Sequence, residues 1–386
     1  MVHVVITDCV RLSVSSAPFA SSAVKKGPLP LHPSVDSVGW SDYIAAMGNG
    51  AGRGVPPALL SVIERPGPLV ILPHDNPDPD ALASAATLRF IAKALAGKEA
   101  AIGLGGFVGR AENRAMVRYL NIPLVPVAEL PLTAPDSIIA LVDTQPGRQN
   151  NSLPAGAKAS IIIDHHPQYV SIADVPFADL RDGYGATSTI LTEYMMDTRL
   201  HLETKIATAL FYGIMAETQD LGREASAPDM TATHFLYPHT NKRRLAKIEN
   251  ARVPREYFAV FRAAIHAALI YDRAVVSVLG DLRYPDMVAE IADFLLRLDE
   301  VEWAAAIGRY EGYLYVSLRT THRDVNAGDL LQRVLGSDHA GGHDMIAGGR
   351  LALVPGADWD KVAARIRERL VAEVGMAKAR PVRLCG

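Results

Sequence analysis

Residues 69–97 read LVILPHDNPDPDALASAATLRFIAKALAG, and this stretch decides how the chain folds. It opens on LVILP, an apolar run of the length and type found in buried strands. The run ALASAATLRFIAKALA is rich in good helix formers, and Gly97 follows it as a helix-ending glycine. The sequence therefore predicts a strand, a turn rich in Asp and Pro, and a helix that starts beside Asp80.

Two later runs repeat the pattern of a short buried strand that ends at a polar residue. SIIALV precedes Asp143, and ASIII precedes Asp164. Because helical stretches alternate with these strands, we expect a parallel sheet covered on both faces. Ligands of such sheets bind just beyond the carboxyl ends of the strands. His74, Asp143 and Asp164 stand at those ends, so the sequence predicts a site there.

A second, smaller unit follows the polar segment HTNKRRLAKIENARVPREYF, which we interpret as the interdomain connection. Its strand-like and helix-like runs predict an α/β domain with some antiparallel pairing, which ends in a helix over about 358–376. The predicted fold class is α/β, with a parallel-sheet domain, a smaller mixed-sheet domain and an active site in the cleft between them. The expected segments are an N-terminal extension, a catalytic domain, a linker, a substrate-binding domain and a tail, at 1–56, 57–236, 237–262, 263–376 and 377–386.

Composition limits the classes of function. Of the 386 residues, 39 are Lys or Arg and 42 are Asp or Glu, so the formal net charge is -3, which argues against a dedicated duplex-DNA-binding protein. The two cysteines, Cys9 and Cys385, stand near opposite ends and cannot build a disulfide framework. No apolar run approaches the roughly 20 residues of a membrane helix. We therefore expect a soluble, cytoplasmic protein without membrane partners.

The turn after the first strand carries His74, Asp78 and Asp80, three potential metal ligands within seven residues. A plainer interpretation is a Pro-rich turn in which Asp80 caps the following helix. Asp143 and the tripeptide Asp164–His166 favour the ligand interpretation, because two further strands deliver carboxylates and imidazoles to the same edge.

Imidazoles and carboxylates without thiolates suit Mn²⁺, Mg²⁺, Zn²⁺ or Fe, and Mn²⁺ matches mixed nitrogen and oxygen donors well. So many acidic ligands would repel one another without cations. Their number suits two ions about 3.5 to 4 Å apart that share a carboxylate, an arrangement typical of phosphoryl chemistry.

The motifs HDNPDPDALASA, VDTQ, DHHP, GATS and AGGHDMIAGG resemble, in this order, those of the DHH phosphoesterase superfamily, over roughly residues 70–350. The segment VSLRTTHRDVNAGDLLQRVLG before AGGH resembles the DHH-associated C-terminal domain of nanoRNase/pAp phosphatases and RecJ-type exonucleases. The resemblance implies that His74, Asp78 and Asp143 hold one ion. Asp80, His165 and an acid at the end of a later helix would hold the other, with Asp143 as the bridge.

The resemblance also implies that His166 faces the substrate phosphate or the leaving group, and that Asp164 acts by orienting its neighbours. A packed imidazole beside the sheet is the alternative for His166. The family motif Gly-Ile-x-x-Asp-Thr corresponds here to Gly213–Thr218, with Glu217 in place of the aspartate. Glu217 can still ligate, and Asp220 is a substitute if the helix continues.

In the second domain, Gly341 and Gly342 offer a backbone that can approach a phosphate, and His343 offers a donor. Arg319 ends a predicted strand, where its guanidinium can bind a phosphate bidentately. Taken singly, the glycines could be an ordinary turn and Arg319 a surface charge. In the family context we expect all four to bind substrate.

The sequence thus predicts a metal-dependent phosphoesterase acting on short oligonucleotides or on small nucleotides such as pAp. The sequence has no basic strip rich in aromatic residues on which a long single strand could stack, and this favours short substrates. One alternative is hydrolysis of a cyclic-dinucleotide product, pyrophosphate or polyphosphate. Another is a nucleotide-binding protein that has lost turnover because of Glu217. The assembly is left open, with a homodimer among the options.

Overall fold

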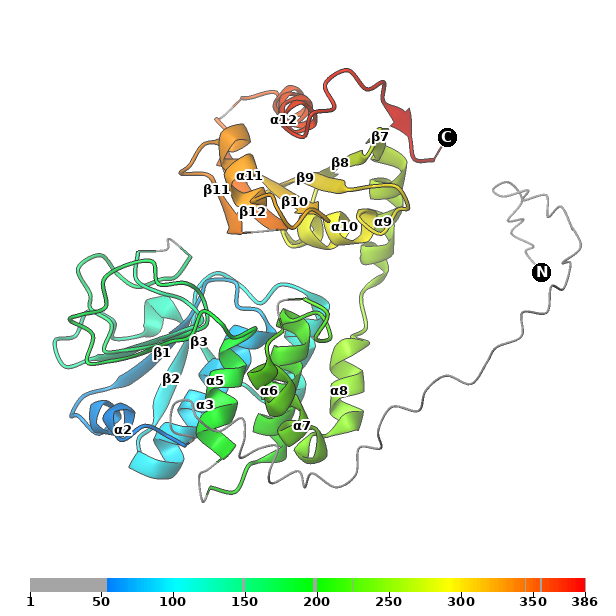
Figure 1. Cartoon of the computed structure of the whole chain (residues 1–386). Coiled ribbons are helices and arrows are strands. Elements are labelled where there is room, and N and C mark those ends of the chain that lie inside the picture. The colour runs from blue at the N-terminus through cyan, green and yellow to red at the C-terminus, as the bar shows by residue number, and fades with distance from the viewer. Residues whose placement is uncertain are drawn as a thin grey trace, which may run out of the picture. The chain divides into compact units, whose positions relative to one another are not determined.

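The computed structural model describes residues 54–385, except 148–149, 197–199, 224, 344 and 355 and the side chain of His343. Of the predicted N-terminal extension 1–56, all but the last three residues lie outside this part. The described chain carries two sheets, each with its own helices (Figure 1). None of its helices has the length and apolar character needed to cross a bilayer.

The first sheet has six strands, all parallel, in the order β3-β2-β1-β4-β5-β6. Its strands are β1 (Leu69–Pro73), β2 (Ala100–Leu104), β3 (Leu124–Pro126), β4 (Ile138–Val142), β5 (Ile161–Asp164) and β6 (Phe177–Leu180). The parallel sheet predicted from the sequence is confirmed. Strand order reverses between β1 and β4, and such a switch point leaves a crevice at the carboxyl ends of the two strands.

Helices cover one face of this sheet, namely α2 (Pro57–Ile63), α3 (Pro79–Ala96), α5 (Thr187–Met196) and α6 (Thr204–Glu217). The remaining helices of this half are α4 (Ala111–Leu120), α7 (Ala227–Leu236), η2 (Tyr237–His239) and α8 (Lys242–Glu249). Alternate residues of β1 face opposite sides, because side chains of a strand alternate. Leu69 and Ile71 pack under the helices, whereas Val70 and Leu72 pack under η1 (Val127–Glu129) and loop residues. Both faces are therefore covered, one of them mainly by loops.

The second sheet has seven strands in the order β11-β12-β10-β9-β8-β7-β13. Only β8 and β9 pair in parallel among these described strands. Their bounds are β7 (Leu269–Tyr271), β8 (Ala274–Asp281), β9 (Trp303–Tyr310), β10 (Tyr313–Thr320), β11 (Ala340–His343), β12 (Ile346–Ala352) and β13 (Val382–Arg383). The predicted α/β unit with antiparallel pairing is confirmed.

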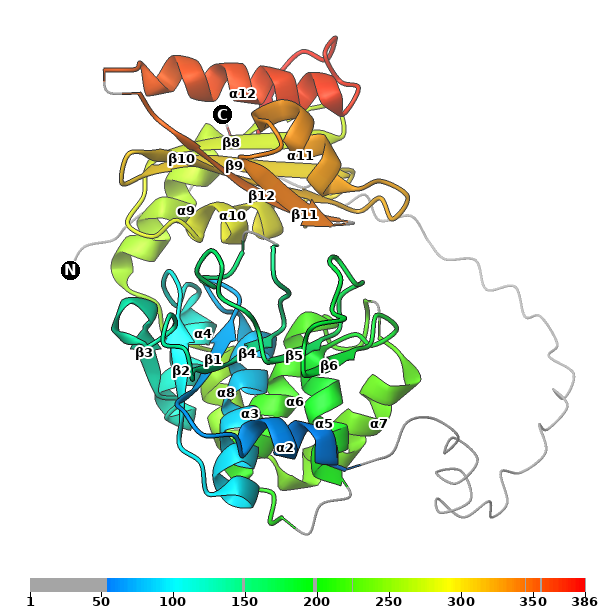
Figure 2. The same ribbon diagram turned by 90° about the vertical axis from the view of Figure 1, so that its left-hand side faces the viewer.

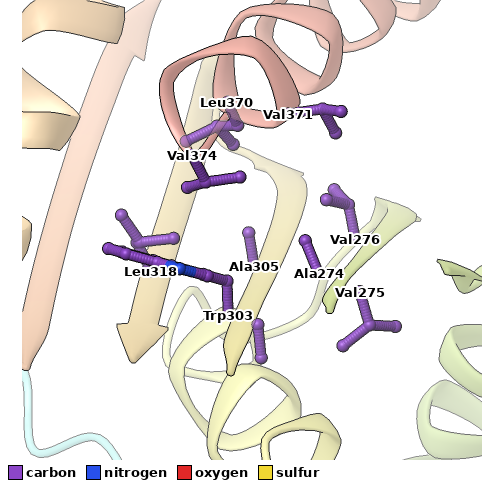
Figure 3. Close-up of a pocket in the computed structure, with 10 residues that line it drawn as sticks. Ala274, Val275, Val276, Trp303, Ala305, Leu318, Leu370, Val371 and Val374 are labelled. Carbon is purple, nitrogen blue, oxygen red and sulfur yellow. The ribbon is translucent and has the colours of Figure 1, made fainter. Parts of the chain in front are cut away.

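Helices cover both faces of the second sheet (Figure 2). On one face lie α9 (Arg255–Ala267) and α10 (Met287–Leu295), and on the other lie α11 (Ala327–Leu335) and α12 (Trp359–Glu373). Under α12 is an apolar gap of about 10 Å³, lined by residues that include Trp303, Leu318 and Val374 (Figure 3). It is barely large enough for one water and offers no polar partner, so it is a packing gap and not a ligand site.

The segment predicted as a linker, 237–262, is largely helical. Helix α8 contacts α4 and α6 of the first half, and α9 contacts β8 and α10 of the second. Asn241 caps α8 with a side-chain oxygen that accepts from the Arg244 N–H at 3.0 Å. Residues 251–254, which are neither helix nor strand, connect the two helices. The domain boundaries themselves stay a prediction.

Candidate metal centre

Asp143 lies at the centre of the candidate site, directly after β4. The residue is 3% exposed and its backbone has a left-handed φ of 58°. Oδ2 lies 3.6 Å from Nε2 of His74. Oδ1 lies 3.6 Å from Nε2 of His165, 3.8 Å from Nδ1 of His166, and accepts from the Thr187 hydroxyl at 2.9 Å. The two oxygens of one carboxylate thus face two separate groups of potential ligands, as a bridging ligand would.

The two imidazoles nearest Asp143 are oriented by backbone carbonyls. Nδ1 of His74 lies 3.0 Å from the Asp75 carbonyl, and Nδ1 of His165 lies 3.0 Å from that of Tyr184. These contacts assign the ring proton to Nδ1 and leave a lone pair on each Nε2. Nε2 of His165 is buried and has no hydrogen-bond partner among the described residues. A buried nitrogen with a free lone pair, held in place by its other nitrogen, fits a metal ligand.

Asp78 and Asp80 have different structural roles. Asp78 is the N-cap of α3, and its Oδ2 lies 3.6 Å from Nε2 of His74. Asp80 is fully buried, and its two oxygens accept from the backbone N–H groups of Thr187 and Ser188 at 2.7 Å each. The alternative interpretation of Asp80 as the cap of α3 is therefore wrong, because its carboxylate instead binds the free N–H groups at the start of α5.

Glu217, the last residue of α6, lies near the site because α6 packs closely on α3, and the charges of Asp78 and Asp143 act on its carboxyl. A Cβ on Gly213 would lie 2.5 Å from the Ser188 hydroxyl and 3.2 Å from Cα of Asp80, so only glycine permits this approach. Glu217 follows one turn later on the same face. Because α6 ends at Glu217, the condition under which Asp220 would replace it is not met, and Asp220 is exposed.

Without cations the cluster would retain protons. Burial, together with the charges of neighbouring carboxylates, raises the pKa of Asp80 to about 7, of Asp143 to about 6 and of Glu217 to about 8. Burial alone would lower the pKa of His74, but the charges of Asp78 and Asp143 raise it to about 10. Divalent ions would replace these protons and relieve the repulsion. The donor set of two imidazoles and four carboxylates therefore fits divalent ions of the Mn²⁺ and Mg²⁺ type.

Gln145 is a residue of the site that sequence reasoning missed. Its fully buried amide donates through Nε2 to Oδ2 of Asp164 at 2.8 Å and to the Pro167 carbonyl at 3.1 Å. Its Oε1 accepts from the Tyr169 N–H at 2.8 Å. Oδ1 of Asp164 in turn lies 2.8 Å from Nδ1 of His166. Gln145 thus fixes both Asp164 and the loop after it; its signal in the sequence was its place in the VDTQ motif, three residues past the end of β4.

A hydrogen-bond network around Arg181, also missed from the sequence, helps to orient His165. Arg181 binds Asp179 through two hydrogen bonds of 2.8 Å and donates to the Tyr184 hydroxyl at 3.0 Å. It also pairs with Glu193. This network holds Tyr184, whose carbonyl orients the ring of His165.

Family models match both halves of the chain. The model of the DHH family, N-terminal domain, matches residues 68–214, and that of the DHHA1 domain matches residues 272–372. The chain belongs to the DHH family. An uncharacterized protein of Methanocaldococcus jannaschii, MJ1633, is 34% identical over 318 residues, which cover 82% of this chain and 64% of that protein.

A further curated protein and a solved structure are less similar to this DHH-family chain. The cyclic-di-AMP phosphodiesterase GdpP of Bacillus subtilis is 22% identical over 298 residues, covering 73% of this chain and 45% of GdpP. The chain thus spans less than two thirds of the length of either curated relative. The crystal structure of an exopolyphosphatase-related protein from Bacteroides fragilis shares the fold, with a TM-score of 0.65, 13% identity and coverage of 84% of this chain and 98% of that one.

In the DHHA1 domain, Arg319 is neither a surface charge nor a fully available phosphate ligand. It is 7% exposed, and its Nε is paired with Oδ1 of Asp293. Its Nη1 donates to the Ser317 hydroxyl at 2.8 Å. Oδ2 of Asp293 also accepts from Arg110 of the DHH domain at 2.7 Å. A role of Arg319 in substrate binding stays a prediction, and these contacts restrict the guanidinium.

Gly341 and Gly342 lie on β11, paired with β12. Gly342 has a φ of 148°, and a Cβ there would come within 2.3 Å of the Ile346 carbonyl oxygen. Close packing of the two strands therefore accounts for this glycine independently of any ligand. The side chain of His343 is outside the described part, so substrate binding by these three residues stays a prediction.

Proposed function

We propose that this DHH-family chain is a metal-dependent phosphoesterase. Two divalent ions, preferably Mn²⁺, would be held by His74, Asp78, Asp80, Asp143, His165 and Glu217. The observation that carries this proposal is the placement of Asp143, whose two oxygens each lie 3.6 Å from a different, pre-oriented imidazole. In a two-metal phosphoesterase, a carboxylate placed in this way would ligate both ions.

The ions, when bound, would lower the pKa of a water and stabilise negative charge on the phosphate. The protein's own residues orient the ion ligands and the proton donor. Thr187 holds Oδ1 of Asp143, and the Nδ1 contacts of His74 and His165 aim their Nε2 atoms at the site. The pKa of Asp164 is lowered against its burial by the bonds from His166 and Gln145, so it stays ionised and keeps His166 in place. We assign to His166 the donation of a proton to the leaving oxygen.

For the substrate, we propose a short oligonucleotide or a small nucleotide such as pAp. The resemblance to nanoRNase/pAp phosphatases supports this choice, and the net charge of -3 disfavours a long polyanion. The two cysteines, Cys9 and Cys385, lie near opposite ends of the chain, which is compatible with a reducing compartment. We propose the cytoplasm as the location. The similarity to GdpP favours a cyclic dinucleotide or its linear product as the second candidate.

The test is hydrolysis of pAp, pApA, a five-nucleotide RNA, cyclic di-AMP and pyrophosphate with Mn²⁺, Mg²⁺ or EDTA. We expect Mn²⁺-dependent turnover of pAp or short RNA, and a loss of at least about 100-fold in Asp143→Asn. Asp174→Asn, on an exposed loop of the same domain, is the matched control and should retain activity.

Full Mn²⁺-dependent activity in Asp143→Asn would refute the site. Tight nucleotide binding without turnover, with turnover gained in Glu217→Asp, would instead identify a binding protein impaired by its glutamate. Preferential cleavage of cyclic di-AMP would replace the proposed substrate by the second candidate.

A further inference from the structure

The loop that follows α6 has an unusual backbone. Gln219, Asp220 and Leu221 have φ values of 48°, 57° and 62°, so three consecutive residues other than glycine are left-handed. Such residues are strained, and strained backbone concentrates where function requires it. Hydrogen bonds from the Arg223 N–H to the Thr218 carbonyl and from the Leu221 N–H to the Thr218 hydroxyl hold the loop. The result is a tight reversal that returns Arg223 to the end of α6.

Arg223 lies against Glu217 at the edge of the metal cluster. Its Nη2 donates to the Glu217 carbonyl at 3.0 Å and lies 3.7 Å from Oε1 of the same residue. The side chain is 10% exposed, and its Nε is buried without a hydrogen-bond partner among the described residues. A buried guanidinium N–H without an acceptor is costly, so an acceptor from outside the described chain would stabilise it.

Other positive charges are close to Arg223. Burial lowers the pKa of Arg319, and the charges of Arg110 and Arg223 act in the same direction, against the opposing effect of Asp293. Arg110 and Arg319 share the carboxylate of Asp293. Because Glu217 is a proposed metal ligand, an ion would compensate its negative charge, and the charge of Arg223 would then require another anion. The region beside Glu217 therefore favours an anionic ligand.

We propose that Arg223 is a substrate-binding residue that donates through its guanidinium to a non-bridging oxygen of the substrate phosphate, on the Glu217 side of the metal cluster. This inference deepens the proposed phosphoesterase function and rests on it. The ligand class is a phosphate group, since a planar guanidinium can offer it two parallel N–H donors. The four residues predicted above to bind substrate lie on the second domain, whereas Arg223 lies on the first domain beside the proposed ion ligand Glu217.

The test compares Arg223→Gln and Arg223→Lys with the wild type and with Arg365→Gln, an exposed arginine of α12. Isothermal titration calorimetry would measure the affinity for inorganic phosphate in the presence of Mg²⁺, and separately the affinity for Mn²⁺. We expect phosphate binding to weaken at least about tenfold in Arg223→Gln, less in Arg223→Lys, and not in Arg365→Gln. Mn²⁺ affinity should change by less than about twofold.

With a hydrolysed substrate, kcat/KM of Arg223→Gln should fall about 100-fold, a typical loss for one donor to a reacting oxyanion. Unchanged phosphate affinity in Arg223→Gln would overturn the inference, and so would a loss of Mn²⁺ affinity with phosphate binding retained, because Arg223 would then only position Glu217. If the wild type hydrolyses nothing but binds phosphate through Arg223, the inference stands and the proposed activity fails.

Discussion

Replacing Gln145 by leucine tests the predicted support of the loop that carries Asp164 and His166. Leucine is close to glutamine in size, so the change removes hydrogen bonds with little loss of volume. The bonds lost are those from Nε2 to Asp164 at 2.8 Å and to the carbonyls of His166 at 3.3 Å and Pro167 at 3.1 Å, and the one that Oε1 accepts from the Tyr169 N–H at 2.8 Å.

The size of the effect follows from these bonds. A hydrogen bond to a charged group contributes about 1.5–3 kcal/mol, and a buried group left without a partner costs about 1–3 kcal/mol. Leucine also gains some apolar burial, so we expect the free energy of unfolding to fall by about 3 kcal/mol. Because bonds to Asp164 hold its pKa below the ordinary value, their stabilisation is present near neutral pH and is lost as pH falls through the folded-state pKa. The difference between wild type and Gln145→Leu should therefore shrink at acidic pH.

Urea denaturation followed by circular dichroism, at several pH values, measures this difference. The matched control is Gln168→Leu, the same chemical change at an exposed position of the same loop, which should alter stability by less than about 0.5 kcal/mol. Equal stabilities of Gln145→Leu and Gln168→Leu at neutral pH would refute the role of Gln145. A difference that grows as pH falls would contradict the contribution of the Asp164 carboxylate.

Three further predictions concern packing, pH and metal. Gly213→Ala places a methyl group 2.5 Å from the Ser188 hydroxyl, so the free energy of unfolding, measured by urea denaturation, should drop by about 1–3 kcal/mol. Gly183→Ala, with open space around its Cβ, is the control and should leave stability unchanged. Equal effects of the two changes would exclude the close approach of α6 to Ser188. Burial raises the pKa of Asp286 to about 6 despite Arg110 and Arg114, so its ionised form opposes folding as pH rises through this value. Asp286→Asn should then stabilise the protein by about 1–3 kcal/mol at pH 8 and not at pH 4, and a pH-independent difference in urea melts would argue against this. Mn²⁺ at about 100 times its dissociation constant should stabilise the fold by about 2.7 kcal/mol per ion relative to EDTA, and thermal melts that coincide would contradict metal binding by the folded state.

The position of the site was predictable from sequence because one rule of parallel sheets determines it. His74, Asp143 and Asp164 each follow an apolar run, and the carboxyl ends of parallel strands meet at one edge. The structure brings these three strand ends together around Asp143. The local sequence alone was sufficient to predict this position, because the strand before each side chain determines where that side chain lies.

Pairings between distant side chains were not predictable. Asp80 binds the N–H of Thr187, 107 residues away, and Arg110 pairs with Asp293, 183 residues away. Local patterns carry no information about which buried carboxylate meets which donor, because tertiary packing determines it. The same applies to Arg319, whose place at the end of β10 was expected but whose pairing with Asp293 was not.

The sequence identified the polar segment between the domains as a connection but did not predict its helices, because most of its positions are exposed. Helix α8 buries only Leu245 and Ile248 among its residues, so its helical pattern of apolar residues was difficult to recognise among the many Lys and Arg residues. Its amphipathic pattern, a buried pair three residues apart behind an asparagine cap, was nevertheless in the sequence.

The most direct test of the metal centre is the number of Mn²⁺ ions bound per chain, measured by native mass spectrometry and equilibrium dialysis for the wild type, Asp143→Asn and Asp174→Asn. The proposed bridge predicts two ions for the wild type and Asp174→Asn, and at most one weakly bound ion for Asp143→Asn. Two ions retained with unchanged affinity in Asp143→Asn would contradict the account.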